Sequence, residues 1–506
     1  MRQTGAEIMG RAERASPLFA VLALWALFVA TNPVGYVGGG HDDTHYLAAA
    51  RCWAEHGPCL PIDHWWRRFP LVAPVSLTIA LFGLSRQTVW IVPAVYSAVA
   101  VVLLTIIVQR QFGRAAGLLA GAAFVLTPVV AIRVIDLGID LPEMALLLGA
   151  AACFQHAVLR KASTFFALSG IFLALAVQCR PTVLAAVPVF CMGLFLIDRR
   201  QCVPFLAGFI IPMLVEAALY QAIAADALLS WRLSLAHTTI PSSELSGVDL
   251  SSSPLFNVRF IQAWQPISGI HLNWFLQGPV NLLVSKEIGI TLYFSLALII
   301  INIKSIGLNI FSNGIAIFLV VASIFYFAAL NYVFAIDPTP RMFLPVLAVA
   351  CAIIGILTPV VWRGPGRIVI VLFFGAIVMR ALLVPFQRYD VDSGIPLARQ
   401  WLQEAPDTEI YPATYSRLAF VSEQRSFREY QGSEGGRILV LDFYSCPAFA
   451  VGAGHLQWRV LREVRFPGSP IKRVLERTGL TGSDNDPVLC LFASPASHRR
   501  DSHARA

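Results

Sequence analysis

A chain of 506 residues that is 57% hydrophobic and 13% charged, with a mean hydropathy of +0.67, does not have the composition of a soluble protein. Soluble domains carry about 25% charged residues, roughly twice the fraction found here. The net charge of +8 does not indicate nucleic-acid binding, because the basic residues lie mainly in short loops and form no basic patch interleaved with aromatic residues. The composition predicts a membrane protein.

Apolar runs that approach or exceed the roughly 20 residues needed to cross a bilayer recur along most of the chain. We predict an all-α polytopic membrane protein with about eleven transmembrane helices, the first of them retained rather than cleaved as a signal peptide. The runs are Leu18–Ala30, Val89–Val108, Ala115–Ile132, Ile139–Val158, Thr164–Val177, Thr182–Ile197, Val203–Ile223, Ile288–Ile303, Ile310–Leu330, Phe343–Val361 and Ile368–Val384.

The loop charges predict an orientation with the N-terminus in the cytoplasm and the C-terminus outside. In this orientation the short basic turns all fall inside, as the positive-inside rule requires. Two long loops, 36–88 and 224–287, then lie outside, so chemistry is expected on the outer face. The basic residues of the inner turns are Arg110, Arg114, Arg160, Lys161, Arg199, Arg200, Lys304, Arg363 and Arg367.

The first long loop is expected to hold two further helices. His41–Glu55 is expected to be a short helix that ends before Gly57-Pro58. Phe69–Gly83 is apolar but short and contains two prolines, so an interfacial or re-entrant helix is expected there. Counting it as a crossing would invert every later loop and spoil the charge pattern.

Beyond Phe386 the proportions of charged residues, proline and glycine become those of a soluble protein. We therefore divide the chain into a transmembrane domain, 1–386, and a small extracytoplasmic α/β domain, 387–506. The elements expected in the second domain are a helix at Ile395–Leu402, strands at Glu409–Tyr411, Arg437–Phe443 and Leu456–Val464, and a disordered tail at Ser494–Ala506.

The nine cysteines show no zinc-binding spacing. Cys52 and Cys59 share the first long loop, and Cys446 and Cys490 share the C-terminal region, so either pair could form a disulfide in an oxidising compartment. The remaining cysteines lie in or beside apolar runs and are expected to be small core residues: Cys153, Cys179, Cys191, Cys202 and Cys351.

The sharpest local feature is the acid pair Asp42-Asp43, which follows the glycines 38–40 after the first span. Two adjacent carboxylates repel each other, and glycines allow a partner to approach the backbone closely. One carboxylate could take a proton from a hydroxyl, or the pair could help to bind a divalent cation, with His41 and His45 beside them. An N-cap cluster that favours the helix dipole is the alternative, and both remain open.

A second acid, Asp140, lies where a predicted span re-enters the bilayer, a position at which ionisable groups are costly and usually functional. Helix capping before Leu141-Pro142 is the structural alternative, and the two roles can coexist. For the neighbouring acids Asp136 and Glu143 we favour a structural role.

Several arginines share the predicted outer face, among them Arg67, Arg68, Arg180 and Arg341. The planar guanidinium suits phosphate oxygens and keeps its charge in a partly dry site. One such residue usually reaches towards lipid headgroups. Several of them on the face that the positive-inside rule disfavours indicate an anionic ligand.

The order and spacing of these motifs resemble the GT-C glycosyltransferases, in particular the bacterial branch related to protein O-mannosyltransferases and lipid A aminoarabinose transferases. The resemblance covers Leu18–Pro345. This chain departs from the family at Asp43, where Glu is usual, and at Arg68 and Phe69, which replace Lys or His and a proline. The stretches that carry the resemblance are Asp42-Asp43 with Tyr46, Arg68-Phe69-Pro70-Leu71, Leu81-Phe82-Gly83, Thr127-Pro128 through Asp140-Leu141-Pro142, Leu168–Ala176 and Pro340–Pro345.

The resemblance implies a glycosyltransferase that moves a sugar, with inversion, from a polyprenyl-phosphate carrier to a cell-envelope lipid or glycan, and less readily to a protein. The reaction would take place on the periplasmic face of the bacterial inner membrane. Asp42 would be the general base or position the acceptor, with support from Asp43, and Asp140 would orient acceptor or sugar. Arg68 and Arg341 would hold the donor phosphate. The metal requirement stays open, with a divalent cation as a candidate cofactor.

Two other functions stay open. A transporter or flippase is expected to show ionisable residues or broken helices at mid-membrane and inverted repeats, neither of which is evident. An O-antigen ligase or polymerase that uses a diphosphate-linked donor would depend on a large late external loop. In this chain that loop contains Arg232, Arg259 and His271.

Overall fold

The computed structural model is mainly helical. It describes residues 17–30, 41–238 apart from 62 and 135, 282–302 apart from 284 and 286, 314–333, 340–362, 366–388, 395–411, 428–429, 436–442, 446–447, 450, 457–465 and 488–493.

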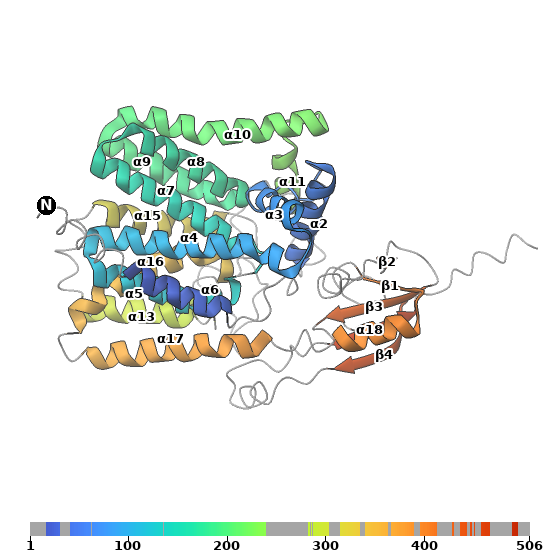
Figure 1. The fold of residues 1–506 in the computed structure, drawn as a ribbon. Helices are drawn as coiled ribbons and strands as arrows, with labels where there is room; N and C mark the ends of the chain where they lie inside the picture. The colour runs from blue at the N-terminus through green and yellow to red at the C-terminus, as the bar shows by residue number, and fades with distance from the viewer. Residues whose placement is uncertain are drawn as a thin grey trace, which may run out of the picture.

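The long helices lie side by side in one bundle (Figure 1). Apolar residues cover most of their length, and many of these form one continuous buried core. Besides the helix Pro17–Ala30, the bundle helices are α4 (Arg86–Phe112), α5 (Arg114–Leu126), α7 (Asp140–Arg160), α8 (Ser163–Cys179), α9 (Val187–Asp198), α10 (Cys202–Ala224), α13 (Gly289–Ile301), α15 (Gly314–Ala328), α16 (Leu344–Val361) and α17 (Arg367–Arg388).

Each of the eleven predicted runs contains at least one helix, and the chain is a multi-pass membrane protein. Four described helical segments are both long and apolar enough to cross a bilayer. Of the other runs, Ile368–Val384 forms the 22-residue α17, and the rest form shorter helices. One of the four, Pro181–Ala224, spans 44 residues and joins two predicted runs. Between them Asp198 has an extended backbone, and its carboxylate accepts a hydrogen bond from Arg200 N, so α9 ends before α10 begins. The number of crossings stays a prediction.

The run Thr182–Ile197 begins with a 3₁₀ helix (Pro181–Ala186) that leads into α9. A second run is also divided. Ala115–Ile132 is divided into α5 and a short helix α6 (Pro128–Arg133). The break falls at Thr127, whose backbone is extended because the proline that follows disfavours a helical conformation in the preceding residue. The Thr127 hydroxyl bonds Ala123 O at 2.7 Å within the turn and lies 3.0 Å from the Thr291 hydroxyl of α13.

Helices α8 and α10 pack closely through two glycines. A Cβ atom at Gly170 would lie 2.1 Å from the carbonyl oxygen of Phe205, and one at Gly208 would lie 2.0 Å from that of Ala167. Small residues permit such close contact between membrane helices, where packing replaces the hydrophobic effect as the driving force. This contact fixes α10 beside α8, whose C-terminus leads into the candidate site.

At one end of the bundle lie α2 (His41–His56), α3 (Phe69–Phe82) and α11 (Leu229–Thr238), as Figure 1 shows. The helices expected at His41–Glu55 and Phe69–Gly83 are therefore present. Helix α3 has a proline in its first turn, where the missing N–H costs nothing. A disulfide joins Cys52 of α2 to Cys59, which follows the helix.

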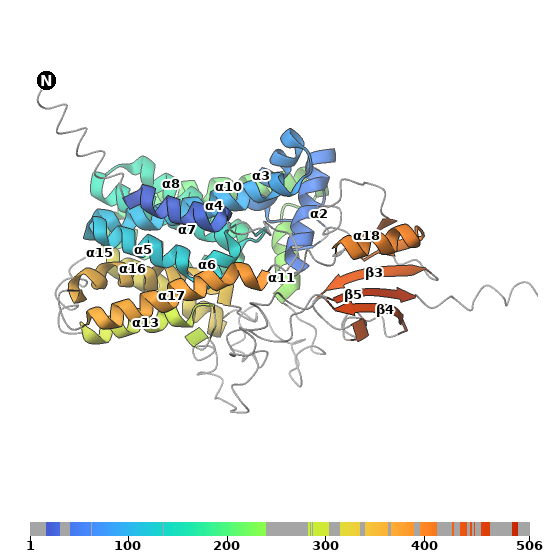
Figure 2. The same cartoon turned by 60° about the horizontal axis from the view of Figure 1, so that its bottom comes forward.

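A five-stranded sheet with the order β2-β1-β3-β5-β4 follows near the C-terminus. Strand β1 is parallel to β2 and β3, and β5 is antiparallel to β3 and β4. Figure 2 shows helix α18 (Ile395–Glu404) on one face of the sheet. The strands are β1 (Thr408–Ile410), β2 (Arg428–Glu429), β3 (Arg437–Asp442), β4 (Arg459–Arg465) and β5 (Val488–Ala493).

Both faces of the sheet are covered, so the last strand is buried throughout except at its final residue. Trp401 of α18 packs on one face, and Trp458 packs on the other beside the disulfide between Cys446 and Cys490. Both candidate disulfides are thus formed, and the five remaining cysteines are free thiols, none of them exposed. The expected tail Ser494–Ala506 lies outside the described residues. The division of the chain at 386/387 stays a prediction.

Candidate active site

The first predicted acid, Asp42, lies in the first turn of α2 and is held from two sides. Its Oδ1 accepts a hydrogen bond from the indole nitrogen of Trp65 at 3.0 Å. Its Oδ2 accepts one from Arg341 Nη2 at 2.8 Å, across 299 positions of sequence. The carboxylate and the guanidinium are each about a quarter to a third exposed, so water and ligands can reach the pair.

Asp140, at the start of α7, is almost fully buried among three arginines. Arg180 Nη2 donates to Asp140 Oδ1 at 2.6 Å, and Arg133 Nη1 lies 3.7 Å from Oδ2. Arg341 Nε lies 4.0 Å from the same oxygen, so Arg341 stands between Asp140 and Asp42. The capping alternative for Asp140 is wrong, because Ile139 is the N-cap and no side chain caps the helix. The two predicted acids therefore converge.

Glu143 completes the buried part of the site. Arg180 Nη1 lies 2.8 Å from Glu143 Oε2, and the Tyr326 hydroxyl at the end of α15 donates to Oε1 at 2.7 Å. A carboxylate without such partners would be costly at this depth. Glu143 thus serves as counter-ion to Arg180, which agrees with the structural role favoured for it, and Asp136 pairs with Arg133 at 3.3 Å.

Arg68 lies at the N-cap position of α3 and contacts α2. Its Nη1 donates to the Tyr46 hydroxyl, and its guanidinium lies over the Tyr46 ring, 5.5 Å from the centroid. Burial raises the pKa of the Tyr46 phenol, which therefore stays neutral at physiological pH. The charges of four side chains act on this phenol, and they are Arg68, Asp42, Arg180 and Asp140. The two predicted acids therefore belong to one cluster with Arg68 and Arg180.

Arg68 also retains hydrogen-bonding capacity. Within the described part of the chain, its buried Nε has no hydrogen-bond partner. A buried donor without a partner is costly, and an anionic ligand would satisfy it. Asp43, next to Asp42 in α2, is buried at 8% exposure.

A second layer of side chains orients Trp65. Asp63 Oδ2 lies 2.6 Å from His45 Nδ1, and Asp63 Oδ1 accepts hydrogen bonds from the backbone nitrogens of Trp65 and Trp66. Burial would raise the pKa of the Asp63 carboxyl, but the hydrogen bonds from His45 and these backbone groups hold it below its usual value. The His45 and Trp65 rings stack at 4.3 Å. The indole N–H is thereby directed at Asp42.

The donor set of the site suits an anion. The partners of Asp42 and Asp140 are arginines and an indole, and the described residues contain no group of three or more His, Cys, Asp or Glu that could hold a metal ion. The metal question stays open. Of the late-loop residues, Arg232 is largely exposed and pairs with Asp226, while Arg259 and His271 lie outside the described residues.

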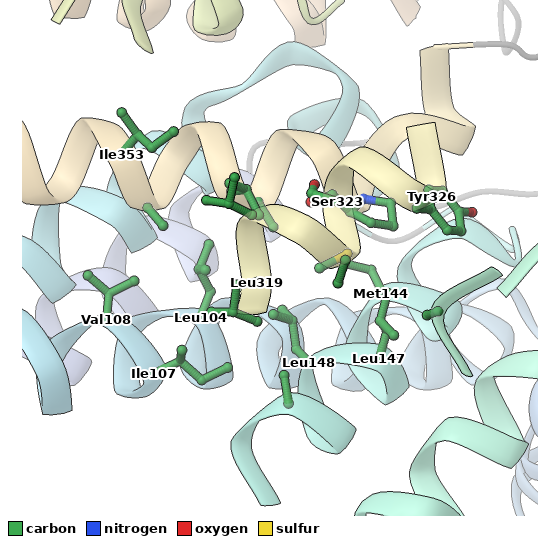
Figure 3. Close-up of a pocket in the computed structure, with 18 of the residues that line it drawn as sticks. Leu104, Ile107, Val108, Met144, Leu147, Leu148, Leu319, Ser323, Tyr326 and Ile353 are labelled. Atoms are coloured by element: carbon green, nitrogen blue, oxygen red, sulfur yellow. Dashed lines mark hydrogen bonds between the residues drawn. The ribbon is translucent and has the colours of Figure 1, made fainter. Parts of the chain in front are cut away.

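An apolar pocket lies among the bundle helices (Figure 3). Side chains of α4, α7, α15 and α16 line most of it, including Leu104, Leu148 and Ile353. Its cavity volume is about 100 Å³. Tyr326, which hydrogen-bonds Glu143, is also one of its lining residues, so the pocket and the charged cluster share a side chain.

Sequence reasoning named Asp42, Asp140, Arg68 and Arg341 as candidates but gave no role to Trp65. Arg180 was noticed only as one of several cations. Nothing in the spacing marks Trp65, because its contact with Asp42 depends on how the loop folds back.

Comparison with known proteins supports the resemblance drawn from the motifs. Residues 70–221 match the sequence profile of the dolichyl-phosphate-mannose-protein mannosyltransferase family. No curated protein sequence matches the chain. The archaeal oligosaccharyltransferase of Archaeoglobus fulgidus in the apo form is similar in structure, with a TM-score of 0.50 at 14% identity, over 83% of this chain and 62% of the archaeal chain.

Two further solved structures are similar. The oligosaccharyltransferase AglB of A. fulgidus in complex with an inhibitory peptide and a dolichol-phosphate has a TM-score of 0.50 at 13% identity, over 84% of this chain and 62% of its own. ArnT from Cupriavidus metallidurans in the apo state has a TM-score of 0.49 at 13% identity, over 97% and 98% of the two chains.

The fold is similar to that of the A. fulgidus oligosaccharyltransferases over more than four fifths of this chain. Segment 70–221 is similar in sequence to the protein mannosyltransferases, so the predicted resemblance is confirmed. The chain spans less than two thirds of the length of the archaeal enzymes. The shared fold therefore does not assign their complete activity to this chain.

Proposed function

We propose that this protein is a glycosyltransferase that moves a sugar from a polyprenyl-phosphate carrier to a cell-envelope glycan or lipid. The observation that carries the proposal is the position of Arg341 between Asp42 and Asp140. A base, a buried orienting acid and a cation reachable from water thus share one site. The match to the mannosyltransferase profile and the A. fulgidus complex with dolichol-phosphate support a lipid-linked donor.

The reaction is a direct displacement at the anomeric carbon. The acceptor hydroxyl oxygen forms the new bond from one side while the bond from that carbon to the phosphate oxygen breaks on the other, which inverts the configuration. The electron pair leaves with the phosphate, and the acceptor proton passes to Asp42. Arg68 and Arg341 stabilise the charge that accumulates on the phosphate. Asp140 orients acceptor or sugar, and Asp43 supports Asp42.

Arg341 has a further part in this mechanism. Without donor, its guanidinium holds Asp42 at 2.8 Å. The donor phosphodiester offers two non-bridging oxygens, which share one negative charge, to the same guanidinium and draws it away from the carboxylate. Asp42 is then free to accept the acceptor proton. Asp140 loses little by this exchange, because Arg180 and Arg133 stay beside it.

The apolar pocket provides room for the isoprenoid chain of the donor. Isoprenoid groups have no hydrogen-bonding atoms and fit a lining made of Leu, Ile, Val and Phe side chains. Tyr326 joins the pocket to the charged cluster, so a chain placed there leads towards the phosphate-binding arginines.

The proposed location of the site is the periplasmic face of the bacterial inner membrane. Helix α7 begins at Asp140 and runs 21 residues to Arg160, about 30 Å at 1.5 Å per residue, close to the thickness of the hydrocarbon core. The basic turn at Arg160 and Lys161 then lies on the opposite, cytoplasmic side. The disulfides Cys52–Cys59 and Cys446–Cys490 are typical of an oxidising compartment.

The test is transfer by the purified full-length chain in lipid nanodiscs, with synthetic polyprenyl-phosphate sugars as donors and envelope lipid extract as acceptor. We expect Asp42→Asn to reduce turnover by roughly 100- to 10,000-fold, the range of general-base catalysis. The matched control is Glu55→Gln, an exposed carboxylate at the other end of α2. Full transfer by both Asp42→Asn and Asp140→Asn would refute the assigned roles. Transfer only from diphosphate-linked donors would favour a ligase or polymerase, and movement of lipid without a new glycosidic bond would favour a flippase.

A further inference from the structure

Outside the candidate site, three buried polar side chains form a hydrogen-bonded group. This group joins the segment before α3 to α10 and α11 at the same end of the bundle. Arg67 Nη1 donates to the Ser230 hydroxyl of α11 at 2.9 Å, and that hydroxyl donates to Glu216 Oε1 of α10 at 2.7 Å. Arg67 and Glu216 also form an ion pair at 4.0 Å. All three residues are at most 3% exposed.

Arg67 remains charged although it is buried. Burial lowers the pKa of Arg67 to about 10, while Glu216 opposes this shift, so the guanidinium keeps its proton at pH 7. A buried ion pair adds little net stability, because desolvation offsets the attraction, and apolar residues of similar volume often replace it without loss. Its distinctive contribution is geometric, since fixed hydrogen-bond lengths allow one register of the three elements.

This group is directly linked to the candidate site through the backbone. Arg67 and Arg68 are consecutive but contact different elements: Arg67 reaches α10 and α11, whereas Arg68 reaches Tyr46 of α2. The backbone between them is tight, with Phe69 N donating to Arg67 O at 2.8 Å. A shift of Arg67 therefore moves the guanidinium of Arg68.

Helix α10, which carries Glu216, also contacts the segment of the other buried arginine. The Gln178 side chain donates to Pro212 O of α10 at 2.9 Å, one turn before Glu216. Gln178 is two residues before Arg180, which holds Asp140. Helix α10 therefore contacts the segment on which Arg180 lies, and Glu216 joins the same helix to Arg67.

We infer that Arg67, Ser230 and Glu216 are positioning residues that fix the donor-phosphate arginine Arg68 through helix α11. Ser230 is the central member, because its one hydroxyl accepts from the cation and donates to the anion. This inference rests on the proposed function and deepens it, since it makes α11 part of the donor site. None of the three residues touches the reacting atoms.

The test measures binding of polyprenyl phosphate to the purified full-length chain in nanodiscs. We expect Ser230→Ala to weaken binding by about three- to tenfold, the effect of one or two misplaced hydrogen bonds. Ser230→Thr keeps the hydroxyl and is expected to retain most of the affinity. The matched control is Ser234→Ala, one turn further along α11, whose hydroxyl bonds only Ser230 O within the helix among the contacts described.

Two further variants separate positioning from folding. In an Arg68→Ala background, Ser230→Ala is expected to change the affinity by less than about twofold, because the residue through which it acts is gone. The double variant Arg67→Met with Glu216→Met removes both charges together. We expect it to unfold at about the wild-type temperature but to bind polyprenyl phosphate more weakly than the wild type.

The outcomes distinguish this inference from the proposed function. A wild-type chain that does not bind polyprenyl phosphate would overturn the donor assignment itself. A wild-type chain that binds, with Ser230→Ala binding equally well, would overturn only the positioning group. Recovery of both stability and affinity in the double methionine variant would likewise show a purely structural pair.

Discussion

Two arginine–carboxylate groups at the same end of the bundle differ in their access to water. Arg341 and Asp42 are 31% and 25% exposed, whereas Arg67 and Glu216 are 2% and 3% exposed. An exposed pair contributes little to stability and can exchange partners with a ligand. A buried pair cannot separate without leaving a charge unpaired. The protein thus combines one ion pair suited to exchange with another suited to holding geometry.

Arg180 belongs to the buried class, and its removal is expected to have the largest effect. Arg180→Ala leaves both Asp140 and Glu143 buried without their closest cation. Breaking such a group costs about 3–5 kcal/mol, a large part of the stability of a folded domain. We expect little monodisperse protein and a sharply lowered unfolding temperature. Arg160→Ala, at the exposed end of α7, the helix that carries Asp140 and Glu143, serves as the control. Normal stability of Arg180→Ala would contradict the comparison.

Arg341→Ala tests the exchangeable class. The folded state should be nearly unchanged, because the pair with Asp42 is partly exposed to solvent. Affinity for polyprenyl phosphate should fall by roughly 10- to 100-fold, since a charged hydrogen bond to phosphate contributes about 1.5–3 kcal/mol. Titration in nanodiscs measures the affinity and thermal unfolding the stability. A collapse of stability like that expected for Arg180→Ala would place Arg341 in the buried class instead.

The sequence predicted the locations of helices better than their contacts. Apolar length found every bundle helix, because burial in lipid requires long apolar runs irrespective of the packing partner. The break at Thr127 was missed, although the proline after it carries the signal. Asp42 and Arg341 were both found as candidates on the outer face, but only the fold brings residues 299 positions apart into contact.

The buried groups were harder to foresee. Glu216 lies inside an apolar run, and Ser230 has no distinctive neighbours in sequence. Their meeting with Arg67 depends on the close packing of α10 and the path of the chain into α11. Charge position in a membrane protein therefore predicts which side of the bilayer a residue faces. It does not predict which charges neutralise one another.

The apolar pocket offers a smaller effect that is independent of either charged group. Ala151 lines the pocket from α7, and Ala151→Phe should occupy part of it. Each methylene of ligand kept out of an apolar site costs about 0.8 kcal/mol, so a long-chain polyprenyl phosphate should bind several-fold more weakly. Farnesyl phosphate, whose chain is shorter, should be affected less. Equal losses for the two chain lengths would exclude the pocket as the site of the chain.

Trp65→Phe should have the smallest effect and sharpens the account of Asp42. The phenyl ring keeps the stacking partner His45 but loses the indole N–H that bonds Asp42 Oδ1 at 3.0 Å. Because the Asp42 carboxylate is partly exposed to water, this hydrogen bond contributes about 0.5–1.5 kcal/mol, which corresponds to a two- to tenfold lower turnover. Binding of polyprenyl phosphate should not change, because Arg68 and Arg341 are untouched. A variant with weakened binding but normal turnover would mean that Trp65 contacts the donor and does not orient Asp42.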